Sequence, residues 1–532
     1  MKKLLLATAV AFGALTANAQ TWTAPATWST SFTPADTVTA LSGVHTLVLA
    51  DSSVVVTGTY NATFTLGNTT LTNDDKMVRA FIAKYDAKGN VQWLRALDGS
   101  ALIMGADADS EGNIYVVGNF AGELNLDAST TLKGQTSYGE YTEDYAAGFI
   151  AKYDKDGNVT ASHTFVPVTP AASTGYADYV AMNSYYFHPS KIKYNNGRVY
   201  VSAMYMGDVQ ENGVTLWPGC VIEMADWGMS MDVERTGGVL SLDASLSNAQ
   251  SEVLYRSDVN PAAIGGARNI SFDVDNNQVY AVAQGAGTFY AFAGGDSTKV
   301  ELQNTNDESG NYEHAFVATN VADKLTKAYH VAMNAEEYGT DIVNNVVYSN
   351  GNLYVGGTYY NQLGFNTSLA SKGSADMFVA KLAASSLEPA WAVTSGYDEG
   401  DVNKYEEHMY AMDVKGDTVF VSGVARDKAS YATQKVLNYN VVDGKLTAST
   451  DTTGYSWVNS NANGVTATAS TSNTTLSLNV YEASSSTGIA GVKTNTGKAS
   501  SAIYSLSGMK MGNSLDKLPK GIYVVNGKKI VK

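Results

Sequence analysis

A thirteen-residue phrase occurs twice in this chain, and it limits the fold more than any other feature does. The phrase FIAKYDAKGNVQW begins at Phe81, and FIAKYDKDGNVTA begins 68 residues later at Phe149. Repetition over such a distance is typical of proteins built from copies of one supersecondary unit. We therefore expect a chain made of repeated units rather than one irregular domain.

A short apolar run that ends in a glycine or another small residue also recurs along the chain. Its six copies begin at Val54, Ile114, Val199, Val279, Leu353 and Val419. Turn sequences rich in Gly, Asn and Asp precede most copies, and these residues supply the positive φ of a tight hairpin. A second run follows each first one, as at Phe81 and Phe149, and in the third copy we assign it to residues 221–225. With a strand before and a strand after, each repeat predicts four strands.

The first runs are apolar at every position instead of alternating, so each is expected to be buried on both faces. Four-stranded units that stack face to face around an axis give their inner strands two buried faces, which predicts an all-β protein with a β-propeller fold. Six repeats are complete. A seventh is predicted to combine strands at 464–470 and 474–483 with two outer strands from the N-terminal segment that contains Trp22, Trp28 and Phe32. Seven blades are expected, with six as the alternative.

Two repeats carry a family resemblance. GNIYVVGNFAGELNLD with AAGFIAKYDKDGNVT, and GNLYVGGTYYNQLGFNT with ADMFVAKLAASSLEPAWAV, resemble the bacterial β-propeller repeat known as SBBP. The resemblance spans most of residues 36–455. It implies the fold and no chemistry, because that family has no shared catalytic set.

Composition and the N-terminus indicate an exported protein. Apolar residues make up 44% of the 532 residues, charged residues make up 16%, and the net charge of −16 argues against nucleic acid as a partner. Lys2 and Lys3 precede an apolar run, and Ala19 and Gln20 flank a small-x-small cleavage site, which predicts a signal peptide over residues 1–19. No later segment is long enough to predict a transmembrane span. Cys220 is the one cysteine, so no intramolecular disulfide is expected, and a buried apolar role is favoured for it.

The end of the chain differs in charge from the body. Residues 485–532 hold eight lysines and one acid, which predicts a separate C-terminal module after a propeller over residues 20–484. This tail resembles the C-terminal sorting domain of proteins exported by the type IX secretion system. The matching positions are Tyr504, Gly508, Leu518, Gly521 and Tyr523. The resemblance implies contact with the secretion machinery and a secreted or cell-surface location.

Motifs for metals and catalysis are weak. The segments 107–112, 154–157 and 273–276 look like calcium loops, but each coincides with a hairpin turn, and the first has Gly118 where an EF-hand needs glutamate. No cofactor is therefore predicted, with calcium as the alternative. No histidine pair has zinc-site spacing, and no nucleophile or phosphate-loop motif is present.

Tyrosine is the suggestive excess. Six tyrosines fall in long connections and are candidate binding residues, since aromatic rings with a polar tip favour recognition of protein or sugar: Tyr176, Tyr179, Tyr185, Tyr186, Tyr359 and Tyr360. Packing within large loops explains them equally well. The sequence thus favours a non-catalytic propeller that binds protein or glycan through its loop faces. The alternative is a secreted hydrolase or lyase of glycans with paired carboxylates in the axial pocket.

Overall fold

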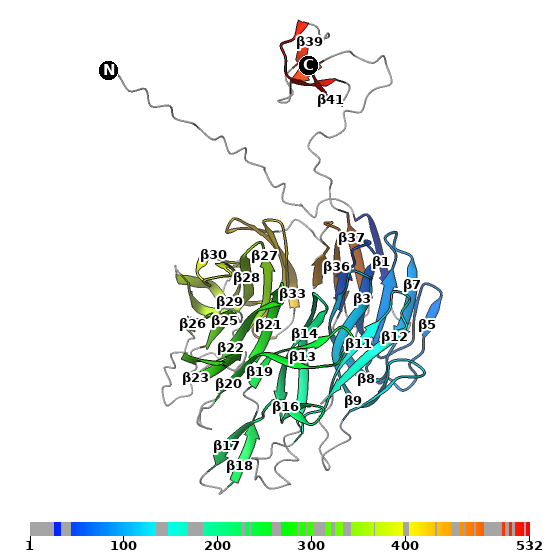
Figure 1. Ribbon diagram of the computed structural model, residues 1–532, viewed down its shortest axis with the longest axis vertical. Coiled ribbons are helices and arrows are strands. Elements are labelled where there is room, and N and C mark those ends of the chain that lie inside the picture. The colour runs from blue at the N-terminus through cyan, green and yellow to red at the C-terminus, as the bar shows by residue number, and fades with distance from the viewer. Residues whose placement is uncertain are drawn as a thin grey trace, which may run out of the picture. The chain divides into compact units, whose positions relative to one another are not determined.

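The computed structural model contains β-strands and turns in the part of the chain that it describes (Figure 1). The described residues are 26–32, 44–134, 147–168, 185–224, 229–233, 236–257, 268–285, 288–293, 296–301, 314–320, 325–332, 342–365, 368–396, 404–430, 433–448, 457–461, 463–472, 475–482, 503–505, 510–512, 517–525 and 528–532. The chain divides into two compact units, Met1–Ala483 and Ser484–Lys532. The all-β fold is as predicted.

The first unit is built from four-strand antiparallel meanders, of which seven can be traced in the described residues. We number them along the chain. The first three are β2 (His45–Val48), β3 (Val54–Tyr60), β6 (Arg79–Tyr85) and β7 (Val91–Ala96); β8 (Asp98–Ala108), β9 (Ile114–Asn125), β11 (Ala147–Tyr153) and β12 (Val159–Phe165); and β13 (Tyr186–Asn195), β14 (Arg198–Met206), β19 (Thr236–Asp243) and β20 (Gln250–Ser257).

The next three meanders repeat this order. They are β21 (Arg268–Asp275), β22 (Gln278–Gly285), β25 (His314–Asn320) and β26 (Leu325–Ala332); β27 (Ile342–Ser349), β28 (Asn352–Gly364), β29 (Ser368–Ala383) and β30 (Pro389–Thr394); and β31 (Tyr405–Lys415), β32 (Thr418–Asp427), β33 (Thr433–Val442) and β34 (Lys445–Ala448).

Short hairpins and edge strands are inserted between strands of the meanders. They are β4 (Phe64–Leu66) with β5 (Thr69–Leu71), β10 (Thr131–Lys133) on β9, β15 (Val209–Glu211) with β16 (Val214–Trp217), β17 (Cys220–Met224) with β18 (Met229–Val233), and β23 (Thr288–Ala293) with β24 (Asp296–Glu301), where β23 also pairs with β20. The β17–β18 hairpin corrects one prediction. Residues 221–225 were assigned to the third strand of their repeat, but that strand is β19, because β17 pairs with β18 instead.

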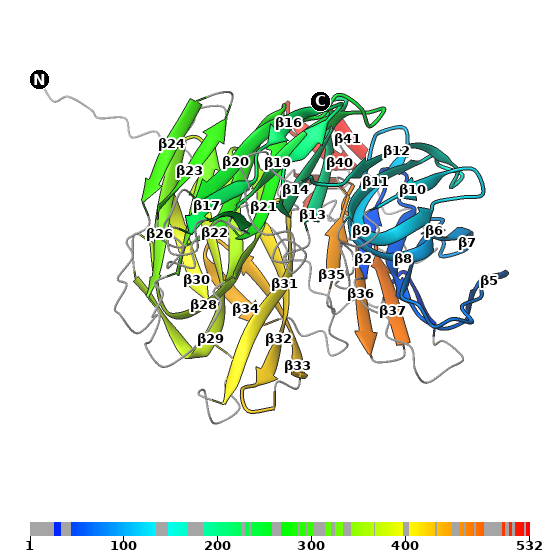
Figure 2. The same cartoon turned by 90° about the horizontal axis from the view of Figure 1, so that it is seen from below.

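The last meander joins the two ends of the first unit. It consists of β35 (Trp457–Ser460), β36 (Thr466–Ser472), β37 (Thr475–Tyr481) and, as the outermost strand, β1 (Trp28–Phe32). The register of β1 on β37 runs from Trp28 opposite Val480 to Phe32 opposite Leu476, and Figures 1 and 2 place the last strands beside the first ones. A meander shared between the two ends was predicted, but the number of strands that each end contributes differs from the prediction. The C-terminal side supplies three strands and the described N-terminal segment supplies one, while Trp22 lies outside the described residues.

Apolar cores lie between successive meanders. Val55 packs in a core with the second meander, whereas its neighbours Val54 and Val56 pack in a core with the last one, against residues such as Leu476 and Leu478. Every residue of β3 is buried, as expected for a strand covered on both faces. Further cores join each meander to the next along the chain. This is β-propeller architecture. The number of blades stays a prediction, for which these contacts favour seven.

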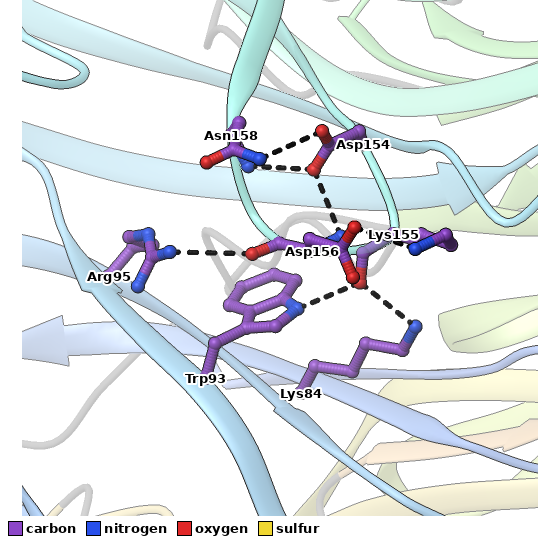
Figure 3. Close-up of polar contacts among 7 residues, drawn as sticks. All are labelled: Lys84, Trp93, Arg95, Asp154, Lys155, Asp156 and Asn158. Carbon is purple, nitrogen blue, oxygen red and sulfur yellow. Dashed lines mark hydrogen bonds and ion pairs between the residues drawn. The ribbon is translucent and has the colours of Figure 1, made fainter.

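The repeated phrase serves to join neighbouring meanders (Figure 3). In the turn between β11 and β12, Asp154 accepts hydrogen bonds from the backbone N–H groups of Asp156 and Asn158, at 2.9 and 2.8 Å, and from the Asn158 side-chain amide at 2.9 Å. Asp86 and Asn90 form the same turn in the first copy. The aspartate therefore fixes a turn whose carbonyl groups point outward for other residues to bind.

Side chains of the preceding meander bind those carbonyl groups. The Trp93 indole N–H and the Lys84 ammonium both donate to the Lys155 carbonyl, at 3.0 and 3.3 Å, and Arg95 Nη2 donates to the Asp156 carbonyl at 3.3 Å (Figure 3). Arg95 Nε also donates to the Gly157 carbonyl, at 3.0 Å. Gly157 has φ +80°, and a Cβ there would lie 2.8 Å from the Trp93 ring. The first copy of the phrase thus supplies Lys84 and Trp93, which contact the turn of the next meander. The second copy supplies that turn.

The same contact recurs at the ring closure. Gly89, in the first copy of the turn, faces the ring of Trp28 on β1. Between the fifth and sixth meanders, Gly444 faces Trp391 on β30 in the same way. Trp28 of the last meander therefore covers the turn of the first meander, just as Trp93 covers the turn of the second.

The second unit is a small sheet. Its strand order is β39 (Lys510–Gly512), β38 (Ile503–Ser505), β40 (Ile522–Val525) and β41 (Lys528–Val531). Ile503 and Tyr523 are buried in it, and the Tyr523 hydroxyl donates to the Pro519 carbonyl at 2.8 Å. Gly521 and Lys532 exchange two backbone hydrogen bonds, which tie down the end of the chain.

Candidate functional site: an axial cavity

A cavity of about 320 Å³ lies where the first strands of the meanders meet. Residues of β2, β8, β13, β21, β27, β31 and β35 line it, so each traced meander contributes its first strand. A cavity of this size falls in the range of small-ligand sites. We call it the axial cavity.

Strand register sorts the lining residues into two tiers. In the second meander, Asp107 of the first strand pairs with Tyr115 of the second strand. The residues at this same paired position in all seven first strands form the second tier: Leu47, Asp107, Lys193, Asp273, Val347, Asp413 and Asn459. The first tier lies two residues earlier in each of these strands, on the same face. Its members are His45, Gly105, Lys191, Ser271, Asn345, Ala411 and Trp457.

A bulge just before the first tier brings additional side chains into the cavity. Register shifts occur between Ile103 and Gly105 and at the corresponding places of β13, β21, β27 and β31. A bulge leaves one residue unpaired and re-aims its side chain. Met104, Ser190, Asn344 and Tyr410 are such residues, and all four line the cavity.

Oxygen atoms of the second tier connect neighbouring meanders. Asp107 accepts a hydrogen bond from the Tyr194 backbone N–H at 2.7 Å, and Asp273 accepts one from the Tyr348 N–H at 2.8 Å. At the ring closure, the Asn459 side-chain oxygen accepts from the Val48 N–H at 2.7 Å. In each case the donor belongs to the first strand of the following meander. These oxygens therefore hold the inner strands in register.

The charges of the second tier are unbalanced. Lys193 Nζ lies 3.9 Å from Asp273 Oδ1, and attraction by Asp273, opposed by burial and aided by Asp107 and Asp413, raises the pKa of Lys193. Burial raises the pKa of Asp107 and that of Asp413. One lysine thus faces three aspartates, so this tier carries a net negative charge when all four groups are ionised.

Lys191 is the cation of the first tier. Its Nζ donates to the Val346 carbonyl at 2.9 Å and lies 6.0 Å from the centre of the Phe272 ring. Burial lowers the pKa of Lys191 to about 8; Asp273 opposes this shift, and the nearby Lys193 adds to it. Among the described residues no acidic side chain forms an ion pair with Lys191.

The other polar members of the first tier are neutral. Burial lowers the pKa of His45 to about 4, so its ring is uncharged at neutral pH, and it packs edge-on against Trp457 with ring centres 4.2 Å apart. The Asn345 amide donates to the Asn344 side-chain oxygen at 2.6 Å. The first tier therefore offers one cation among amide, hydroxyl and aromatic groups.

The tyrosines proposed from sequence do not form this site. Tyr185, Tyr186, Tyr359 and Tyr360 are buried, at 5% exposure or less. Tyr185 and Tyr186 pack with Met206, and the Tyr359 hydroxyl donates to Thr394 at 2.8 Å. Of the two explanations for these four tyrosines, their burial supports packing rather than binding at a loop face, because their rings fill the interior of the first unit. Tyr176 and Tyr179 lie outside the described residues.

Other residues singled out from sequence are placed as follows. Ala19, Gln20 and Gly508 lie outside the described residues. Tyr504 is in β38, Tyr523 is buried in β40, and Leu518 and Gly521 lie in the segment that leads into β40.

The three turns with calcium-like sequences are hairpin turns. Asp109 accepts from the backbone of Glu111 and Asn113, as Asp154 does in its own turn. No cluster of three or more His, Cys, Asp or Glu residues suited to a metal occurs in the described part of the chain.

Sequence reasoning missed the cavity residues, although a signal was present. Asp107 and Asp273 were considered as parts of turns, and Lys191 and Lys193 were not considered. Asp107, Asp273 and Asp413 each lie in the first strand of a repeat, shortly before its hairpin turn. Aligning the repeats on their turns would have collected them into one tier.

No family model and no curated protein matches the chain. Solved structures similar to it include a protein of unknown function from Dyadobacter fermentans, with 9% identity over 78% of this chain and 98% of that one, at a TM-score of 0.39. A DUF4221 family member from Bacteroides vulgatus has 10% identity over 86% and 98%, at 0.33. The α-L-arabinofuranosidase Arb93A from Fusarium graminearum, solved with an iminosugar inhibitor, has 9% identity over 79% and 94%, at 0.34.

A search for membrane-spanning helices among the described residues finds none that is sufficiently long and apolar.

Proposed function

We propose that this chain is an exported, non-catalytic β-propeller that binds a small saccharide in its axial cavity. The observation that carries the proposal is the lining of that cavity, which combines two lysines, three aspartates, amides, hydroxyls and the Trp457 and Tyr410 rings. Saccharides present hydroxyl groups for hydrogen bonding and flat apolar faces for aromatic rings, and amphipathic rings suit such contacts. With four of the candidate tyrosines buried, the axial cavity replaces the loop faces as the proposed site.

The cavity volume limits the ligand. Since a water molecule occupies about 30 Å³ of liquid, the cavity has room for roughly ten water molecules. This suits one sugar unit, either free or at the end of a longer glycan.

Export and surface attachment belong to the same proposal. The support for them is the signal-peptide pattern before Gln20 and the resemblance of the tail to a type IX sorting domain. Under this proposal the second unit engages the secretion machinery, and the first unit binds the ligand outside the cell.

A glycan array probed with the mature chain, residues 20–532, tests the binding. We expect retention of glycans with a shared terminal sugar, and loss of that retention in Asn345→Ala, which removes an amide from the first tier. The matched control is Asn479→Ala on β37, outside the cavity lining. If no glycan is retained, or if both variants bind like the parent, the axial cavity is not a saccharide site.

A glycan hydrolase or lyase is the second candidate, because three carboxylates share one tier of the cavity. Burial raises the pKa of Asp413 and of Asp107, as a general acid requires. All three also accept hydrogen bonds from the backbone of the following meander, Asp413 from Ser460, which favours the structural role. Release of reducing ends from a retained glycan, abolished in Asp413→Asn, would support the enzyme; retention without turnover would support the binder.

A further inference from the structure

We propose that the Lys191 ammonium binds a carboxylate, so that the saccharide of the axial cavity is an acidic sugar such as a uronic acid. This inference rests on the proposed function and narrows its ligand. It follows from the pairing of the two cavity lysines, from the neutrality of the first tier and from the charge of the second.

The two lysines of β13 differ in their partners. Lys193 lies within 3.9 Å of a carboxylate and has two more acids in its tier. Lys191 donates one hydrogen bond, to the Val346 carbonyl. An ammonium group has three donors, so two of them are available to a ligand. Lys191 is half-buried, and a cation partly withdrawn from water is normally paired, so an anionic ligand would supply the missing partner.

The groups around Lys191 favour a ligand with a single negative charge over a ligand with two. His45, Ser271, Asn345 and Trp457 share its tier and bring no charge at neutral pH. Next to this tier lie three aspartates with a single lysine. The net negative charge of the second tier repels a dianion more strongly than a monoanion. A ligand with one carboxylate and several hydroxyls therefore fits Lys191 and the amides better than a dianion does.

Binding of a carboxylate would be linked to protonation of Lys191. The other titratable groups of the cavity lining are His45 on β2, Asp107 on β8, Lys193 on β13, Asp273 on β21, and Tyr410 and Asp413 on β31; the lining residues of β27 and β35 are not ionisable. Burial lowers the pKa of Lys191 to about 8. An anion favours the protonated form, so affinity is full below that pH and falls as the pH rises through about 8.

Titration calorimetry of the mature chain with D-glucuronate, D-glucose and sulfate at pH 6.5 and pH 9 tests the inference. At pH 6.5 we expect glucuronate to bind at least tenfold more tightly than glucose, with sulfate weaker than glucuronate. The preference should shrink at least fivefold at pH 9. Lys191→Met should abolish it, and Lys191→Arg should keep it at both pH values.

Lys133→Met is the matched control, because Lys133 is 79% exposed on β10, outside the cavity lining. Melting temperatures of all variants establish that they fold. Equal binding of glucuronate and glucose, or a preference that survives in Lys191→Met, overturns the inference and leaves the saccharide proposal standing. Lys191-dependent binding of sulfate without either sugar overturns the saccharide proposal instead. If none of the three probes binds, both are overturned.

Discussion

Asp107 shows how one residue serves both the ring and its cavity. It lies at the end of the first strand of one meander and accepts a backbone hydrogen bond from Tyr194 in the next. Asp273 and Asn459 repeat this arrangement with Tyr348 and Val48. A buried N–H group that loses its acceptor destabilises a fold more than a single hydrogen bond stabilises it. The oxygen atom, rather than the negative charge, is therefore expected to be the essential feature at this position.

Two substitutions at Asp107 separate these properties. Asp107→Ala should lower the free energy of unfolding by about 1–3 kcal/mol, because it leaves the Tyr194 N–H without an acceptor. Asp107→Asn keeps an acceptor and removes a charge whose burial raises the pKa of this carboxyl, so it should unfold close to the parent. Denaturant unfolding of both variants checks this. Equal destabilisation by the two would mean that attraction between Asp107 and Lys193 dominates instead.

At the scale of elements, the contact between a tryptophan and the following turn joins the meanders at their outer strands. Trp93 is 7% exposed, its indole N–H donates to the Lys155 carbonyl, and its ring covers Gly157. Trp28 and Trp391 make the equivalent ring contact on Gly89 and Gly444. Trp28 belongs to β1 in the last meander, and Gly89 belongs to the first. The same contact between a tryptophan and a turn therefore joins the last meander to the first as well as internal meanders to one another.

Substitution of Trp93 measures this contact. Trp93→Ala should destabilise the first unit by about 3–5 kcal/mol, as expected when a large aromatic residue is lost from a core. Trp93→Phe keeps most of the ring and loses the hydrogen bond to Lys155, so about 1 kcal/mol is expected. Thermal unfolding of both variants tests the difference. A Trp93→Ala variant that melts with the parent would show that the meanders are held together without this contact.

These elements were predictable to different degrees. The first apolar runs identified the second strand of the first six meanders, because a strand buried on both faces leaves a continuous hydrophobic signal, as in β3. The Asp-x-x-Gly-Asn turns were equally clear. The third strand of the third meander was misplaced, since Val221 and Ile222 are as apolar as a core strand but pair within an inserted hairpin. β35 was missed because it is four residues long and includes two polar ones.

The site was less predictable than the fold. Lys191, Asp273 and Trp457 are separated by many residues along the chain and meet because the ring brings first strands together. No local motif encodes such a meeting. The buried tyrosines show the opposite error: aromatic residues such as Tyr359, in a segment expected to be a loop, extend a strand and fill the core.

At the scale of the whole first unit, the axial cavity depends on closure of the ring. Asn459 and Trp457 line it from the C-terminal side of the closure, and both also bind β2, through the Val48 N–H and the Thr46 carbonyl. The outer edge of the same meander is β1 on β37. Without β1, the edge of β37 would be left open to pair with other chains. Ring closure therefore requires that residues near 28 and residues near 480 lie side by side in the folded monomer.

A disulfide across this pair tests the requirement most directly. Ser29 lies opposite Asn479, and directly opposed residues of antiparallel strands have Cα atoms about 4.5–5.5 Å apart, within the range of a disulfide. In a Cys220→Ser background, Ser29→Cys with Asn479→Cys should oxidise to an intramolecular cross-link and raise the melting temperature, while each single cysteine variant should not. Full reactivity of both thiols after oxidation, or cross-links between molecules only, would contradict closure of the ring by β1.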